Sequence, residues 1–381
     1  MTEKIYYSDA YIAEFEAKVI SCEPMGECYD TVLDRTAFFP EEGGQYADSG
    51  YIDTAAVCDV KEIDGIIHHY TDKKLTPGSR VFCKINFDER YEKMQCHTGE
   101  HILSGIIHKL YGLSNVGFHL GAVDVTMDIS KPLTQEELLR VERLANEVIY
   151  KNVPVTAHFP SLDELSAMEY RSKLQLTENV RIVTVGEYDA CACCAPHVRS
   201  TGEIGLIKIL DTSKLRGGMR LHISAGRRAM KLFQSFYTNA ERISEALSVP
   251  KCEISDGVER LLCELSLVKG KLLAEKTARM EREAELVPNT DKNALYCFDD
   301  AEFSELIAFS NKAIGKVGGI LVLLSGEDSS YRYVISSVSH DLKALAPEIN
   351  KSLLGRGGGR PSMIQGSFNA SLEDIKRYFN L

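Results

Sequence analysis

Two pairs of metal-binding residue types, each spaced four positions apart, constrain this chain more than any other feature of its sequence. His97 and His101 fall in a segment with helical spacing of apolar residues, so both imidazoles can share one helix face, one turn apart. Cys193 and His197 form the second pair, in a turn that contains a proline. Since one thiolate and three imidazoles suit tetrahedral zinc, the sequence predicts a zinc site shared by both pairs.

Two alternatives to the shared zinc site remain open at this point. The two pairs can be unrelated, each packed or hydrogen-bonded on its own. His97-x-x-Glu100-His101 also matches the H-x-x-E-H pattern of inverted zinc metalloproteases, in which Glu100 would be the general base. That hypothesis requires a distant carboxylate as third ligand and gives Cys193 and His197 no role.

Length and composition indicate an ordinary globular protein of more than one domain. With 381 residues, 44% hydrophobic and 26% charged, two or three domains are expected. There is no apolar run near the roughly 20 residues that a bilayer-spanning helix needs, and no signal-peptide pattern at the N-terminus. We therefore expect a cytoplasmic protein whose eleven cysteines are reduced thiols.

The pattern of apolar residues predicts an α+β fold. Residues 1–88 carry short strand-like runs separated by glycine and proline turns, which indicates a β-barrel or folded sheet. Residues 89–228 predict an α+β core that holds the zinc site. Helices are expected over Arg90–Tyr111 and Thr134–Lys151, the second with a capping box formed by Thr134 and Glu137.

The rest of the chain predicts a helical segment and a further α/β domain. Residues 229–287 are helical in pattern, with a break at 248–250. Heptad-spaced apolar residues in the second helix predict either a coiled-coil contact between two copies or packing on the same chain: Val258, Leu261, Leu265, Val268 and Leu272. Residues 288–381 contain strand-like runs at 320–324 and 333–337, and a glycine-rich stretch at 355–361.

Charge gives a mixed indication about nucleic acid. The net charge of −11 disfavours a phosphate-binding surface. Between Lys208 and Lys231, however, there are seven basic residues and a single acid, Asp211. This basic strip is either a solvated face or a contact for a polyanion.

The order of motifs resembles a known family. Residues 35–50, RTAFFPEEGGQYADSG, resemble the glycine-rich signature that opens the editing domain of alanyl-tRNA synthetase. The two ligand pairs, and then 202–205 and 217–220, follow in the order of that family, and 357–361 resembles the glycine-rich loop of the C-terminal domain shared with DHH phosphoesterases. The chain is similar over nearly its whole length to the long form of the free-standing AlaX editing proteins, without the class II aminoacylation core.

This resemblance implies a function and a set of site residues. His97, His101, Cys193 and His197 would hold zinc, and Thr36 and Gln45 would lie beside the aminoacyl group and the terminal adenosine. The substrate would be tRNA for alanine wrongly charged with serine, or with glycine. The C-terminal domain would support dimerisation or tRNA contact. The residues expected to contact tRNA are Arg216, Arg220, Arg227, Arg228, Arg356, Gly357, Gly358, Gly359 and Arg360.

The sequence also departs from the family pattern. The usual Cys-Gly-Gly-Thr-His turn has Cys194-Ala195-Pro196 in its middle here. Cys191 stands two positions before the ligand cysteine, where the family commonly has an acid, and is an alternative ligand. Glu100 is unusual between the two histidines.

The expected chemistry is hydrolysis of a ribose ester, in which the protein orients water and stabilises an oxyanion. Glu100 and His119 are candidate proton carriers, against the alternatives of a surface carboxylate and a buried hydrogen-bonded histidine. Since a hydroxyl can be selected by hydrogen bonding, we expect Thr36→Val to erode a preference for serine. A non-catalytic tRNA-binding or oligomerisation protein with structural zinc remains the alternative function.

Overall fold

The computed structural model describes residues 2–122, 124–172, 180–327 and 329–381. The chain divides into two units, Met1–Glu241 and Arg242–Leu381. Both units combine helices with β-sheets, so the predicted α+β class is confirmed. Within the described residues, none of the helices combines the length and apolar character that crossing a membrane requires.

The first unit begins with six strands that pair in the closed order β2-β3-β7-β6-β5-β8. Strand β8 returns to β2 through an antiparallel ladder, which closes the barrel. Buried and exposed residues alternate along β2 and β8, because successive side chains of a strand point to opposite faces. A short parallel pair, β1 with β4, precedes the glycine-rich segment. The strands are β1 (Glu3–Lys4), β2 (Glu14–Met25), β3 (Cys28–Leu33), β4 (Arg35–Thr36), β5 (Gly50–Ile52), β6 (Ala55–Ile63), β7 (Ile66–Thr71) and β8 (Arg80–Ile85).

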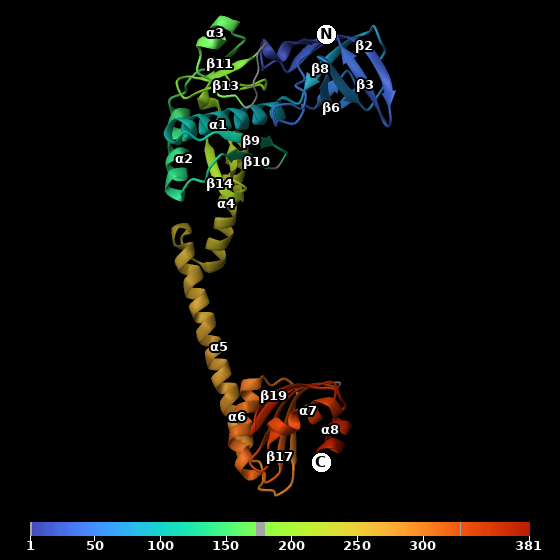
Figure 1. Ribbon diagram of the computed structural model, residues 1–381, viewed down its shortest axis with the longest axis vertical. Coiled ribbons are helices and arrows are strands. Elements are labelled where there is room, and N and C mark those ends of the chain that lie inside the picture. The colour runs from blue at the N-terminus through green and yellow to red at the C-terminus, as the bar shows by residue number, and fades with distance from the viewer. Residues whose placement is uncertain (1, 123, 173–179, 328) are drawn as a thin grey trace. The chain divides into compact units, whose positions relative to one another are not determined.

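The long helix α1 (Phe87–Tyr111) lies between the two sheets that complete this unit (Figure 1). One sheet has the order β14-β15-β10-β9 and the other the order β11-β12-β13. Every residue of 93–107 is buried, so the middle of α1 is core on all sides. The remaining elements are β9 (Asn115–Leu120), β10 (Val125–Ile129), α2 (Gln135–Tyr150), β11 (Val155–His158), α3 (Leu162–Ala167), β12 (Ile182–Val185), β13 (Asp189–Ala192), β14 (Ile207–Leu215) and β15 (Gly218–Ala225).

Two glycines on α1 let these sheets approach the helix closely. A Cβ at Gly99 would lie 2.9 Å from the Cβ of Ala225, and one at Gly105 would lie 2.4 Å from the carbonyl oxygen of Tyr188. This contact brings the start of β13 against the helix turn that carries His101. The predicted capping box at Thr134 and Glu137 is confirmed, because each of these side chains accepts from the backbone N–H of the other residue.

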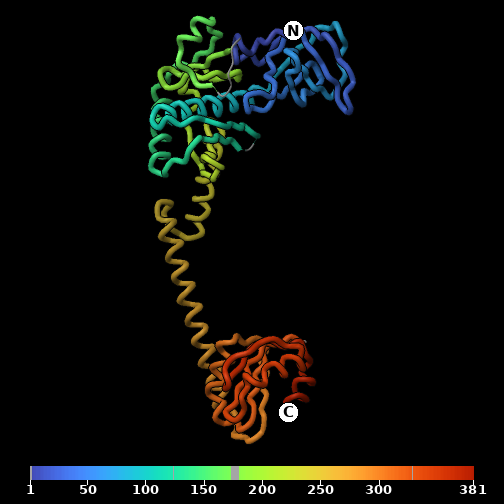
Figure 2. Tube along the Cα trace, viewed as in Figure 1, coloured from blue at the N-terminus to red at the C-terminus, as the bar shows by residue number. Residues whose placement is uncertain are grey.

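Helix α4 (Gly226–Leu247) leaves the first unit and ends at Leu247, immediately before the break predicted at 248–250. Ser248 adopts a positive φ of 54°, which ends the helix there. In the second unit, α5 (Ile254–Glu285) leads into the C-terminal sheet (Figure 2). The heptad positions of α5, from Val258 to Leu272, are exposed in the single chain.

The C-terminal sheet has the order β16-β17-β18-β20-β19. The strands predicted at 320–324 and 333–337 lie within β17 and β18, which pair antiparallel. The elements are β16 (Ala294–Phe298), α6 (Phe303–Ala313), β17 (Ile320–Glu327), β18 (Ser330–Ser337), α7 (Leu342–Ser352), β19 (Arg356–Arg360), β20 (Met363–Phe368) and α8 (Leu372–Tyr378).

The glycine-rich stretch was expected to be a loop, and this expectation was wrong. Residues 356–360 form strand β19, which pairs with β20 along its whole length. Gly357 faces Gly366 across this ladder, and a Cβ at Gly357 would lie 2.3 Å from the carbonyl oxygen of Gln365. The glycines therefore permit close pairing of two backbones.

Candidate metal centre

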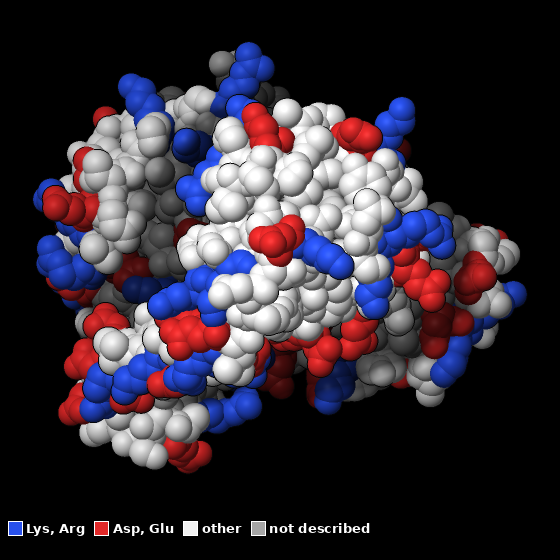
Figure 3. Space-filling view, turned by 90° about the horizontal axis from the view of Figure 1, so that it is seen from below, with Lys and Arg blue, Asp and Glu red and all other residues white. Residues whose placement is uncertain are grey.

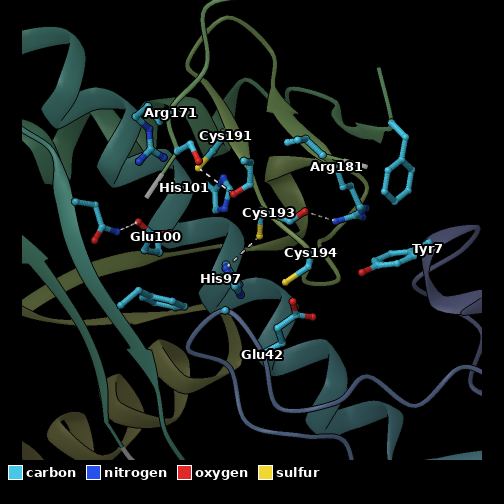
Figure 4. Close-up of a pocket in the computed structure, with 17 residues that line it drawn as sticks. Tyr7, Glu42, His97, Glu100, His101, Arg171, Arg181, Cys191, Cys193 and Cys194 are labelled. Carbon is cyan, nitrogen blue, oxygen red and sulfur yellow. Dashed lines mark hydrogen bonds between the residues drawn. The ribbon is translucent and has the colours of Figure 1, made fainter. Parts of the chain in front are cut away.

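The two ligand pairs meet in the first unit. Figure 4 shows His97, His101 and Cys193 of this cluster side by side. One potential ligand atom from each of His97, His101, Cys193 and His197 lies within 4.8 Å of all the others. The thiol Sγ of Cys193 is 3.5 Å from Nε2 of His97 and 3.4 Å from Nε2 of His197. The partners of the two helix histidines are thus a cysteine and a histidine, rather than the distant carboxylate that the metalloprotease hypothesis requires.

The three imidazoles share one arrangement of their ring nitrogens. In each ring, Nδ1 has a hydrogen-bond partner outside the cluster, which leaves Nε2 for the cluster itself. Metal-binding histidines are oriented in this way, since the second nitrogen fixes the tautomer and the direction of the ring. The pairs are His97 Nδ1 with Gln45 Oε1, His101 Nδ1 with Asp189 Oδ2 and His197 Nδ1 with Thr98 Oγ1, each at 3.0 Å.

The electrostatics of Cys193 and His197 favour the protonation states that bind metal, whereas at His101 burial lowers the pKa but Asp189 and Cys193 outweigh burial and raise this pKa well above its ordinary value. Burial raises the pKa of the Cys193 thiol, but His97 and His197 outweigh burial and hold this pKa well below its ordinary value. Burial lowers the pKa of His197 to about 3. A thiolate and a neutral imidazole are the forms that ligate metal, so the donor set fits a tetrahedral zinc ion.

Asp189 links the cluster to a second group of residues. It accepts from Nδ1 of His101 and also from Arg171, at 2.6 Å from Nε and 2.8 Å from a terminal nitrogen. His101, Asp189 and Cys191 together have ligand atoms within 4.8 Å of one another. Cys191 therefore stays an alternative ligand, as its position in the sequence suggested.

A pocket of about 440 Å³ opens beside the cluster. His97, His101 and Cys193 form part of its wall, together with Cys191 and Cys194 (Figure 4). On another side, Tyr7 and Phe159 meet edge to face with ring centroids 5.4 Å apart, and the Arg181 guanidinium lies 5.3 Å from the Tyr7 ring. The pocket thus combines a potential metal, aromatic rings and a cation, which suits part of a nucleotide and its ester.

Glu100 lines the same pocket and is only 4% exposed. Its carboxylate accepts from Ser104 Oγ and from Asn115 Nδ2, both at Oε1. Burial raises the pKa of Glu100, but His101 and Arg171 outweigh it, so the pKa lies below its ordinary value. The structure therefore excludes the alternative that Glu100 is a carboxylate on the protein surface.

The other residues for which the sequence suggested a chemical role, Thr36, Gln45 and His119, do not line this pocket. Thr36 is fully buried, its Oγ1 is 2.8 Å from Nε2 of His69, and it accepts from the Phe38 N–H at 3.1 Å. Gln45 lies behind His97, with its Oε1 on that ring and its Nε2 buried without a hydrogen-bond partner among the described residues. His119 is exposed on β9. Of these three, only Gln45 contacts the cluster.

Several arginines of the basic strip at residues 208–231 form ion pairs with acidic residues of the first unit. Arg220 pairs with Asp128 at 2.7 Å, Arg227 with Asp88 at 2.6 Å and Arg228 with Glu92 at 3.7 Å. Arg216 is exposed in the turn between β14 and β15, and forms no ion pair within the part of the chain that the structure describes. Figure 3 shows one face on which basic and acidic side chains are interspersed. In the second unit, Arg356 and Arg360 are exposed on β19.

Comparison with known proteins identifies relatives over almost the entire chain. The family model "Threonyl and Alanyl tRNA synthetase second additional domain" matches residues 180–221, which include Cys193 and His197. The model "tRNA synthetases class II (A)" matches residues 4–89, which include the barrel strands.

The relatives are editing proteins and synthetases. The alanyl-tRNA editing protein AlaX-L of Pyrococcus horikoshii is 28% identical over 98% of this chain and 96% of its own length. The alanyl-tRNA editing protein Aarsd1 of Mus musculus is 27% identical over 94% of this chain and 92% of its own. The alanine–tRNA ligase of Natronomonas pharaonis is 33% identical over 96% of this chain, which spans only 42% of the ligase. The predicted resemblance is confirmed: over nearly its whole length the chain is similar to the AlaX-like alanyl-tRNA editing proteins.

Proposed function

We propose that this protein hydrolyses the ester bond of tRNA for alanine that carries serine, with glycine as a second candidate amino acid. The observation that carries the proposal is the cluster of His97, His101, Cys193 and His197 in the wall of a pocket, with each imidazole oriented by a partner behind it. Its relatives of full length bear the name of alanyl-tRNA editing proteins, which gives the substrate class.

The four cluster residues would hold a zinc ion, which would supply a Lewis acid or an activated water at the ester. Gln45, Asp189 and Thr98 keep the three rings in the orientation that ligation needs. Tyr7 and Phe159 in the pocket wall would offer faces for the terminal base. The protein therefore acts mainly by positioning an ester that is already activated.

Further contacts with tRNA would come from two places. Arg216 and the neighbouring arginines at 220, 227 and 228 would follow the acceptor arm, and Arg356 to Arg360 of β19 would meet another part of the tRNA backbone. The exposed heptad face of α5 would join two copies of the chain. We assign the four segments 1–88, 89–228, 229–287 and 288–381 to the barrel, the zinc core, a helical linker and the C-terminal domain.

The direct test is to follow loss of the aminoacyl ester from serine-charged and alanine-charged tRNA for alanine. We expect loss of serine with alanine spared, and we expect chelation to stop the reaction and added zinc to restore it. If zinc is bound but neither ester is lost, the non-catalytic tRNA-binding alternative replaces this proposal.

Replacing Asp189 with asparagine should weaken metal binding about 10- to 100-fold, because the charged partner of His101 Nδ1 is lost. The measurement is zinc affinity by competition with a chromogenic chelator. Asp30→Asn is the matched control, since Asp30 holds His68 Nδ1 at 2.9 Å in the barrel, outside the cluster. Equal zinc affinity for D189N and the parent protein would contradict this role of Asp189.

Thr36→Val should lower the free energy of unfolding by about 1–3 kcal/mol, because it leaves His69 and the Phe38 N–H without a buried partner. Denaturant unfolding measures this change. The erosion of serine preference stays a prediction, and it must be measured as the ratio of kcat/KM for seryl and alanyl esters. A variant that is less stable but keeps that ratio would show that Thr36 supports the barrel rather than the choice of substrate.

A further inference from the structure

Glu100 presents a buried carboxylate to the pocket, and only one of its two oxygens is hydrogen-bonded among the described residues. Both of its hydrogen bonds, from Ser104 and Asn115, arrive at the same oxygen, Oε1. Among the described residues, no hydrogen bond reaches Oε2 and no basic side chain forms an ion pair with this carboxylate within 4.0 Å. Since buried polar atoms are normally hydrogen-bonded, Oε2 is an acceptor that a donor group of a bound substrate can satisfy.

Both arginines of the pocket wall are engaged with other partners, and Arg181 donates to the carbonyl oxygens of Cys193 and Ala195. Arg171 lines the pocket, but its guanidinium binds Asp189 through two nitrogens, at 2.6 and 2.8 Å. Asp189 in turn is shared with His101. Arg171 and His101 therefore converge on Asp189, while Oε2 of Glu100 has no hydrogen-bond donor among the described residues.

We propose that Glu100 binds the α-ammonium group of the aminoacyl ester, so that the site accepts tRNA with a free amino acid and rejects tRNA with an N-acylated one. This inference rests on the proposed hydrolysis of aminoacyl-tRNA. In every aminoacyl ester, the ammonium group is attached to the carbon next to the reacting carbonyl. Glu100 lies on α1 three residues after His97 and directly before His101, and all three line the pocket. The carboxylate is thus placed beside the cluster, as the geometry of such an ester requires.

The chemistry of the two groups is complementary. An ammonium offers three N–H donors, and the carboxylate offers an oxygen that no described donor occupies. An N-acetyl or N-formyl amino acid, or a peptide, presents a neutral amide in place of the ammonium and adds bulk at the same point. Glu42 also lines the pocket, but its side chain is more exposed than that of Glu100, so it serves as the comparison carboxylate.

The test compares seryl-tRNA with N-acetylseryl-tRNA. We expect the parent protein to favour the free amine by about 10- to 100-fold in kcat/KM, the range of one hydrogen-bonded charged group. Glu100→Gln should lower kcat/KM for seryl-tRNA by that factor, mainly through KM, and leave the N-acetylated substrate unchanged. Glu42→Gln should keep the preference. The zinc content of each variant is measured alongside.

A binding measurement keeps the test independent of turnover and of how the variant folds. Adenosine carrying serine through a stable 3′-amide should bind the parent protein more tightly than its N-acetyl derivative, by the same factor. If the parent protein hydrolyses seryl-tRNA but treats both amines alike, or if Glu100→Gln slows both substrates equally, the ammonium site is overturned and the proposed function stands. If neither ester is hydrolysed, the proposed function itself fails, and this inference fails with it.

Discussion

Replacing Cys193 with serine should release the metal and lower kcat/KM for seryl-tRNA about 1000-fold, since metal assistance contributes several kcal/mol to an acyl transfer. Cys193 is the sole sulfur in the four-residue cluster, and it lies within 3.5 Å of two of its imidazoles. A serine hydroxyl is a poor ligand, because it is not ionised at neutral pH. The remaining three histidines would then hold zinc weakly.

Metal content by mass spectrometry and deacylation kinetics together check this prediction. Cys96→Ser is the matched control, because Cys96 is buried on α1 outside the cluster and its Sγ donates to the Ala225 carbonyl, which a serine hydroxyl can also do. C96S should keep both zinc and activity. If C193S retains zinc and loses it only when Cys191 is changed as well, Cys191 is a ligand and the assignment of Cys193 as the sulfur ligand is incomplete.

The sequence predicted that His97, His101, Cys193 and His197 lie together, because these potential ligands come as pairs four residues apart. Spacing of this kind reports which side chains share one turn of a helix or a loop. The spacing does not show that the two pairs are close to each other. The structure shows that α1 and the segment after β13 are neighbours, although about 90 residues separate them in the chain. The order of motifs in the family was the signal that joined the two pairs.

The hydrogen-bond partners behind the cluster were missed, because each lies far along the chain from the histidine that it contacts. Asp189 and Thr98 meet His101 and His197 from positions 88 and 99 residues away in the chain. An isolated aspartate or threonine has no local pattern that indicates such a partner. The signal that was available, a conspicuous Glu100 between two histidines, identified the residue but left its role open among a base, a proton carrier and a surface charge.

At Thr36 and in the glycine-rich stretch, the local structure depends on contacts with distant strands that the sequence does not reveal. The resemblance implied that Thr36 lies beside the aminoacyl group, and the structure places it on β4, in the interior, where its hydroxyl contacts His69. Residues 356–360 looked like a loop because glycine is typical of loops, whereas here the glycines let β19 and β20 pair closely. In both cases, contacts made by distant strands decided the local structure over the intrinsic preference of the residues.

Asp48→Asn should destabilise the first unit by about 3–5 kcal/mol, because it removes the anion of a buried ionic network. Asp48 is 2% exposed and accepts from the Phe39 N–H and from the guanidinium of Arg90, each at 2.8 Å. The ammonium of Lys93 lies 3.6 Å from its other oxygen. Asparagine keeps the shape of the side chain but leaves two buried cations with less anionic charge to balance them.

Comparing the free energies of unfolding of D48N and Glu14→Gln by denaturant unfolding separates the loss of the buried network from the loss of an ordinary ion pair. Glu14 pairs with Lys84 at 2.8 Å on the barrel surface, where both side chains are at least half exposed, so E14Q should cost at most about 1 kcal/mol. Equal unfolding free energies for the two variants would contradict a structural role for the network.

Because Lys93 also binds the Ala47 carbonyl at 2.6 Å and precedes His97 by one helical turn, the network fixes the glycine-rich segment to the part of α1 that carries the cluster. D48N should therefore lose zinc affinity along with stability, whereas E14Q should lose neither.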